Sequence, residues 1–152
     1  MSNVAQLIPT LQVAIGPVVL ISGIGLLILS MTNRFGRVID RGRNLARELV
    51  ELPAEGQVRI EAQLHILARR AEYLRRAITS ASVSVLLAAL LIIALFITAV
   101  LQLEDAWLIG ALFVGSLGAL IISLVAFLQD LNESLLAFKL DIGMSPTDKW
   151  MP

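Results

Sequence analysis

The chain has 152 residues, of which 57% are hydrophobic, 16% charged and 5% aromatic, and its charges balance to a formal net charge of zero. The apolar fraction is higher and the charged fraction lower than in soluble domains, so the composition indicates a membrane protein. Cysteine is absent and His65 is the single histidine, which excludes thiol nucleophiles and clustered-histidine metal sites and removes most hydrolase and metalloenzyme chemistries. We therefore expect no enzyme, metal or cofactor; only a carboxylate pair such as Asp40 with Glu72 leaves room for catalysis.

Charged residues are missing from three long stretches of the sequence, residues 1–33, 77–103 and 106–129. A helix needs about 20 apolar residues to cross the hydrocarbon core, so these stretches predict transmembrane helices at about 7–32, 77–101 and 106–128. The first has no basic residue before it, so we expect an anchor that is not cleaved. Gly16–Pro17 predicts a kink in it. Because no span contains an ionisable residue, an ion-coupled transporter is disfavoured.

Between the first two spans, apolar residues recur at spacings of three and four on both sides of a breaker cluster, Pro53–Gly56. The spacing is that of a heptad repeat and predicts two helices of a coiled-coil type. We expect an antiparallel helical hairpin at 34–76, continuous with both spans. The two seams are Phe35, Val38, Gly42, Leu45, Leu49 and Leu52, and Ile60, Leu64, Leu67, Ala71, Leu74 and Ile78.

The third helix is expected to continue past its span, over 129–142, with Leu128, Leu131, Leu135, Phe138 and Ile142 on its packing face and a tail at 143–152. The chain is thus predicted to be a single-domain, all-α membrane protein with three long helices. All ten arginines lie between Arg34 and Arg76. Because basic loops stay in the cytoplasm, we expect the hairpin and the C-terminus there and the N-terminus outside.

Most of these arginines gather at the base of the hairpin, next to the spans. If Leu52 lies opposite Glu55, Arg34 faces Tyr73 and Arg41 faces Ile66. The simpler explanation of such a belt is topology and attraction to anionic headgroups. The sharper one is a specific anion or headgroup site, because guanidinium groups bind phosphate bidentately. We expect Asp40 to pair locally with Arg37, Arg41 or Arg43. The candidate site comprises Arg34, Arg37, Arg41, Arg43, Arg69, Arg70, Arg75 and Arg76.

One eleven-residue run, Asn33-Arg34-Phe35-Gly36-Arg37-Val38-Ile39-Asp40-Arg41-Gly42-Arg43, directly follows the first apolar stretch. The run resembles a family of small bacterial membrane proteins whose domain has no known function, and the layout of most of the chain agrees with that family. The resemblance implies three spans in the bacterial inner membrane. Since the family has no established activity, it supplies no catalytic residues.

Small residues recur every four positions along the third span, as Ala111, Gly115, Ala119 and Ser123. The second span carries a shorter row of Ala77, Ala81, Ser84 and Ala88. Such rows let helices approach closely in lipid, either within one chain or between chains. We expect both uses and therefore a homo-oligomer.

Two functions remain open from the sequence. The first is a non-enzymatic, self-associating membrane protein whose hairpin binds anionic lipid or an unidentified protein partner. The second is a homo-oligomeric ion channel with the arginines at its inner mouth. Polar residues at a frayed terminus, and helix capping by Asp105, are the simpler explanations of the residues that could line such a pore. Nucleic-acid binding is not supported, because the basic residues lack aromatic stacking partners. The candidate pore or mouth residues are Gln6, Thr10, Gln12, Glu104 and Asp105.

Overall fold

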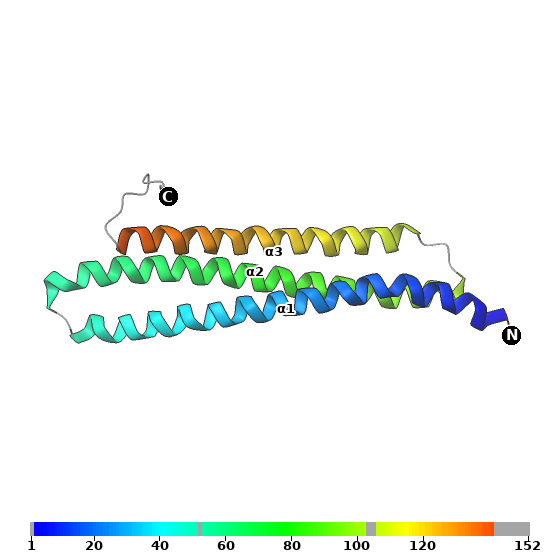
Figure 1. Cartoon of the computed structure of the whole chain (residues 1–152), viewed down its shortest axis with the longest axis horizontal. Coiled ribbons are helices and arrows are strands. Elements are labelled where there is room, and N and C mark those ends of the chain that lie inside the picture. The colour runs from blue at the N-terminus through cyan, green and yellow to red at the C-terminus, as the bar shows by residue number, and fades with distance from the viewer. Residues whose placement is uncertain (1, 52, 103–105, 142–152) are drawn as a thin grey trace, which may run out of the picture. The chain divides into compact units, whose positions relative to one another are not determined.

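The computed structural model of the protein describes the backbone of residues 2–51, 53–102 and 106–141, and side chains at 8–9, 12–51, 53, 57–102 and 106–134. These residues form three α-helices, α1 (Ser2–Glu51), α2 (Ala54–Leu101) and α3 (Ala106–Asp141), and no strand is found among them (Figure 1). Each helix is long and apolar enough to cross a membrane. The prediction of three long membrane-capable helices is therefore confirmed.

The helix ends follow local backbone chemistry. Pro9 and Pro17 lie inside α1, which continues through both residues. The chain then breaks at Pro53 and α2 begins at Ala54, so the break is shorter than the predicted 53–56 cluster. Gln102 has a φ of 51° directly after α2, the left-handed conformation that commonly closes a helix. The rest of this connection lies outside the described residues.

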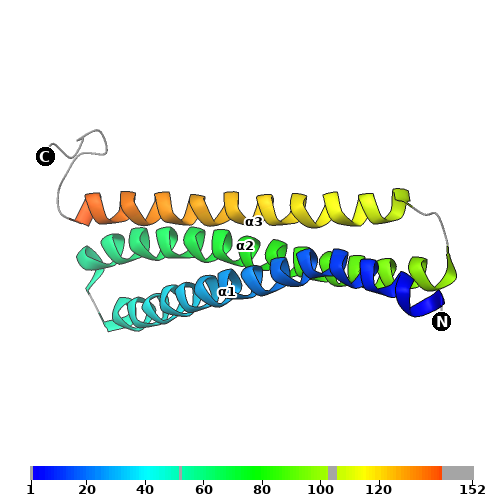
Figure 2. The same ribbon diagram turned by 45° about the vertical axis from the view of Figure 1, so that its right-hand side comes forward.

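Contacts divide the chain into two compact units. We call Met1–Ser30 with Ile78–Ser123 the span unit, and Met31–Ala77 with Leu124–Pro152 the arginine unit. In both views, segments of all three helices lie side by side within each unit (Figures 1 and 2). The arginine unit contains every arginine of the sequence.

In the span unit, α2 and α3 pack through small residues. Ser84 and Ser116 are fully buried, and each hydroxyl donates to the other's backbone carbonyl, over 2.7 Å from Ser84 and 3.1 Å from Ser116. A Cβ atom at Gly115 would lie 3.4 Å from Leu87 Cδ1, which is ordinary contact. This close approach is the one expected of helices that pack in lipid. It places Ala81, Ser84 and Ala88 of the predicted α2 row in the core.

The arginine unit has its apolar core along the two predicted heptad seams. Val38, Leu45, Ile60 and Leu74 are buried, and Met31 extends the α1 seam by one turn. The remaining described seam members are half-buried. The spacing of apolar residues therefore predicted the packing faces of α1 and α2 in this unit.

The predicted packing face of α3 is wrong at Leu128, which is 57% exposed. The buried residues there are Ala126 and Asp130, while Leu131 is half-buried. The other predicted members, Leu135, Phe138 and Ile142, lie outside the described side chains. A membrane-facing helix turns leucines toward lipid and small residues inward, so a search for leucine spacing selects the wrong face.

Candidate anion-binding site

A buried carboxylate lies where the three helices of the arginine unit meet. Asp130 of α3 is fully buried. Its Oδ2 accepts a hydrogen bond from Arg34 Nη2 of α1 at 2.9 Å, and its Oδ1 accepts one from Arg70 Nε of α2 at 3.2 Å. Each carboxylate oxygen thus holds one guanidinium from a different helix. Removing an isolated carboxylate from water costs several kcal/mol, and these two ion pairs offset that cost.

Arg34 is held on a second side by an aromatic ring. Its Cζ lies 5.3 Å from the centroid of the Phe127 ring, within the range of a cation–π contact. Its Nε is buried without a hydrogen-bond partner in the described structure. The side chain is therefore fixed by Asp130 and Phe127, and part of its donor capacity is unused.

The other ion pairs of the unit are more exposed. Arg69 lies 3.0 Å from Glu133, with 65% and 21% of the two side chains exposed. Tyr73 and then Glu133 raise the pKa of Arg69 above its ordinary value, so this guanidinium stays charged. Arg76 pairs at 2.9 Å with Glu72, one turn earlier on α2. Pairs this accessible to water contribute little to stability.

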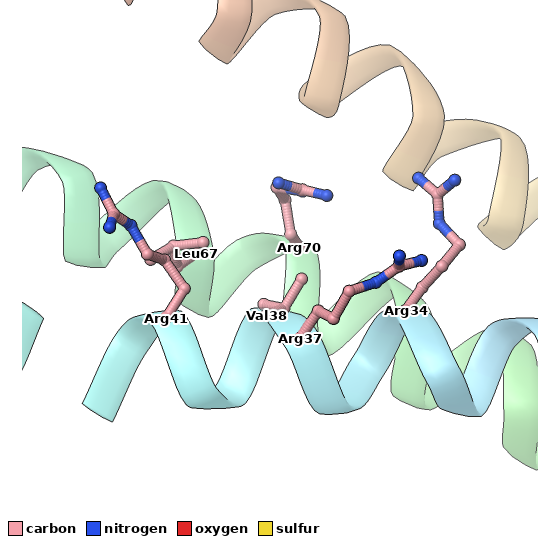
Figure 3. A pocket seen from close by; sticks show the side chains of 6 residues that line it. All are labelled: Arg34, Arg37, Val38, Arg41, Leu67 and Arg70. Atoms are coloured by element: carbon pink, nitrogen blue, oxygen red, sulfur yellow. The ribbon is translucent and has the colours of Figure 1, made fainter. Parts of the chain in front are cut away.

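A cavity of about 290 Å³ opens beside the Asp130 bridge. Four arginines, Arg34, Arg37, Arg41 and Arg70, line it together with two apolar residues, Val38 and Leu67. In Figure 3 the Arg37 side chain extends along α1 toward Arg34, and Arg41 lies at the other end, near Leu67. That Arg41 and Leu67 line one cavity agrees with the register expected for the hairpin. The cavity presents several guanidinium groups over a small apolar floor, which is an arrangement suited to an anion.

The eight predicted site arginines do not act as one group. Arg34, Arg37, Arg41 and Arg70 meet at the cavity, whereas Arg69 and Arg76 are engaged by Glu133 and Glu72. Arg43 lines a separate, mainly apolar cavity of about 330 Å³ with residues such as Gly42 and Leu64. Arg75 is exposed and lines neither cavity.

Asp130 is the buried carboxylate that the sequence analysis did not identify; Asp40 was expected to pair with the neighbouring arginines. Asp40 is exposed and forms no ion pair with the described residues. Two signals pointed to Asp130: it is the first charge after the apolar stretch of α3, and it lies seven residues, two helical turns, beyond the small residue Ser123. That spacing continues the face of α3 that packs inside.

The other predicted candidates are placed as follows. Gln12 is exposed, while the side chains of Gln6, Thr10, Glu104 and Asp105 lie outside those described. His65 is exposed on α2. Within the small-residue row of α3, Ser123 is buried, Gly115 and Ala119 are half-buried and Ala111 is exposed. Among the described residues, no cluster of three possible metal ligands occurs.

Comparison with known proteins gives a family but no relative of known activity. Neither the curated proteins nor the solved structures contain a match to the chain. The model of one family, described as "Protein of unknown function (DUF2721)", matches residues 14–140. That match covers all three helices of the structure except the first residues of α1 and the last of α3. It confirms the resemblance carried by Asn33–Arg43, and the chain belongs to the DUF2721 family.

Proposed function

We propose that the chain is a non-enzymatic, self-associating protein of the bacterial inner membrane whose arginine unit binds the phosphate of anionic lipid headgroups on the cytoplasmic side. The observation that carries the proposal is the cavity lined by Arg34, Arg37, Arg41 and Arg70. Two of its four positive charges, Arg34 and Arg70, pair with one buried carboxylate, Asp130. The local excess of positive charge favours a bound anion.

The position of the arginines in the sequence supports a headgroup as the source of that anion. Arg34 directly follows an apolar stretch that extends to Asn33, and the second such stretch begins at Ala77, one residue after Arg76. Arginines so close to two spans lie at headgroup depth when the spans cross a bilayer. Each contributes about 1 kcal/mol of attraction to an anionic surface. The same bias toward basic residues supports a cytoplasmic location.

Two observations support self-association. Within the most apolar window of α1, 6% of the residues are buried, against 22% in α2. Gly110 and Ala111 of α3 are exposed, and a Cβ at Gly110 would meet nothing within 4 Å. Small residues that face outward on a membrane helix are the contact points that helices of neighbouring chains use.

Native mass spectrometry of the detergent-solubilised protein tests both parts. We expect a complex of more than one chain that retains phosphatidylglycerol and loses phosphatidylcholine. The double variant Arg37→Gln/Arg41→Gln removes two cavity charges that form no ion pair with described residues. At about 1 kcal/mol per charge, its affinity for phosphatidylglycerol should fall roughly 30-fold.

A matched control changes the same net charge elsewhere on the hairpin. Arg47→Gln/Arg59→Gln removes two exposed arginines that line neither of the two cavities described above. The control should keep the affinity of the wild type within about threefold. Equal losses in both double variants would show diffuse attraction to lipid and would contradict a site at the cavity.

A further inference from the structure

We infer that the cavity selects a phosphomonoester, a terminal phosphate carrying two negative charges, over a phosphodiester carrying one. The inference rests on the proposed function and narrows it from anionic headgroups to one headgroup chemistry. It is based on the charges that surround the cavity and on the fact that Asp130 pairs with two of the four arginines there and not with the other two.

Asp130 forms ion pairs with two of the four arginines that line the cavity. Arg34 and Arg70 each donate to one of its oxygens, so the three groups together carry one net positive charge. Their side chains are 25% and 19% exposed, and the carboxylate is fully buried. Arg34 and Arg70 therefore have a counter-charge within the protein, and their charges do not require a ligand.

Arg37 and Arg41 form the uncommitted half. Both are exposed, one turn apart on α1, and neither forms an ion pair among the described residues. Figure 3 shows Arg37 reaching toward Arg34 while Arg41 stands at the opposite end of the cavity. The two guanidinium groups point toward opposite ends of the cavity, so a ligand that is paired with both draws at least one of these exposed side chains toward it.

The two charges of Arg37 and Arg41 match a dianion. Four guanidinium groups less one carboxylate leave three positive charges around the cavity. A phosphomonoester carries about −1.5 to −2 at pH 7 and has three terminal oxygens that accept hydrogen bonds. It neutralises Arg37 and Arg41 without displacing Asp130. A phosphodiester has one charge and two free oxygens, so it leaves one of the two arginines unmatched.

The preference for a phosphomonoester should depend on pH, because the phosphate of the ligand titrates in the neutral range. Arginine stays protonated throughout the neutral range, whereas the second proton of a phosphomonoester leaves near pH 6. Raising the pH from 5.5 to 7.5 increases the dianion fraction about fourfold. Because the monoanion still binds, about five- to tenfold more weakly, binding of a phosphomonoester should tighten about threefold over this range, and binding of a phosphodiester should stay constant.

The test is calorimetric titration of the full-length protein in detergent with dioctanoyl phosphatidic acid and dioctanoyl phosphatidylglycerol. At pH 7.5 we expect phosphatidic acid to bind about five- to tenfold more tightly, the value of one additional charge. The difference should shrink at pH 5.5. It should vanish in Arg37→Gln/Arg41→Gln and persist in Arg47→Gln/Arg59→Gln.

Three results separate this inference from the proposed function. Equal affinities at pH 7.5, or a ratio that does not change with pH, would overturn the inference and leave anionic-headgroup binding intact. No binding of either lipid above that of dioctanoyl phosphatidylcholine would overturn both. Glycerol 3-phosphate that binds as tightly as phosphatidic acid would support the phosphomonoester and overturn the lipid as its source.

Discussion

Asp130 of α3 forms ion pairs with one arginine of α1 and one of α2. A substitution at this residue therefore affects contacts among all three helices of the arginine unit. Its carboxylate is fully buried and each oxygen holds one guanidinium, from Arg34 and from Arg70. Without the carboxylate, two partly buried positive charges lie side by side with no counter-charge. The nearest alternative acid on α3, Glu133, is engaged by Arg69.

The variant Asp130→Asn keeps the shape of the side chain and removes its charge. We expect the free energy of unfolding in a bilayer or mixed micelle to fall by about 3 kcal/mol, because breaking a buried ion pair strands its partners. Glu133→Gln is the control, since its ion pair is more exposed and should cost under about 1 kcal/mol. A loss at Asp130 no larger than at Glu133 would contradict the role given to the bridge.

The position of a site residue could be predicted where it depends on residues close to it in the sequence. Arg34, Arg37 and Arg41 share one face of a helix at spacings of three and four, so their gathering follows from the sequence. Asp130 was not found, because its partners lie 96 and 60 residues away along the chain. Asp40 was chosen instead because it is close in sequence, but it is exposed on the surface of α1.

At the scale of the helices, the contact between α2 and α3 in the span unit depends on hydroxyl groups. Ser84 and Ser116 exchange hydrogen bonds with each other's backbone carbonyls, and their Oγ atoms lie 3.3 Å apart. In hydrocarbon no water replaces a lost bond, yet measured interhelical bonds average only about 0.6 kcal/mol. The close packing that two small side chains allow therefore matters as much as the bonds.

A double-mutant cycle of Ser84→Ala and Ser116→Ala measures the coupling between these hydroxyls. We expect a coupling energy of about 0.6 kcal/mol in the free energy of unfolding. Ser82→Ala should be nearly neutral, because that hydroxyl is exposed and donates to Ile78 of its own helix. Ser84→Leu should cost more than Ser84→Ala, since overpacking typically costs 1–3 kcal/mol. A leucine tolerated as well as alanine would contradict the packing described here.

The helices themselves were predictable because each rests on a local signal. Apolar stretches and the breaker at Pro53 predicted the three helices, and the heptad spacing predicted the buried faces of α1 and α2. On α3 the row of small residues predicted the buried Ser123, whereas the leucine spacing predicted Leu128, which is exposed. Neither pattern predicted that Ser116 and Asp130 are buried. The rule that apolar residues turn inward holds in water and fails for a helix that faces lipid.

For the molecule as a whole, the proposed orientation makes a prediction for accessibility in cells. The arginines between the first two spans favour a cytoplasmic hairpin, and the connection after α2 then lies outside. Val58, near the start of α2, is 71% exposed, and Gln102, directly after α2, is also exposed. In the proposed orientation, these two positions lie on opposite sides of the membrane.

Because the chain has no cysteine, a single introduced thiol reports its own position without background. In intact cells we expect a membrane-impermeant maleimide to label Gln102→Cys at once, and Val58→Cys only after permeabilisation. Labelling both variants with and without detergent gives each its own control. The reverse pattern would place the arginine cavity outside the cell and contradict a cytoplasmic headgroup site.

The central claim is that the arginine cavity holds a phosphate-bearing lipid, and a crosslink made inside native membranes tests it most directly. Leu67 lines the cavity near Arg41, so a photo-activated benzoylphenylalanine at this position can crosslink to a molecule bound in the cavity. Mass spectrometry of the purified adduct should identify a phospholipid. The adduct should disappear with Arg37→Gln/Arg41→Gln and persist with Arg47→Gln/Arg59→Gln. An adduct to another protein, or a lipid adduct that survives the loss of Arg37 and Arg41, would contradict the claim.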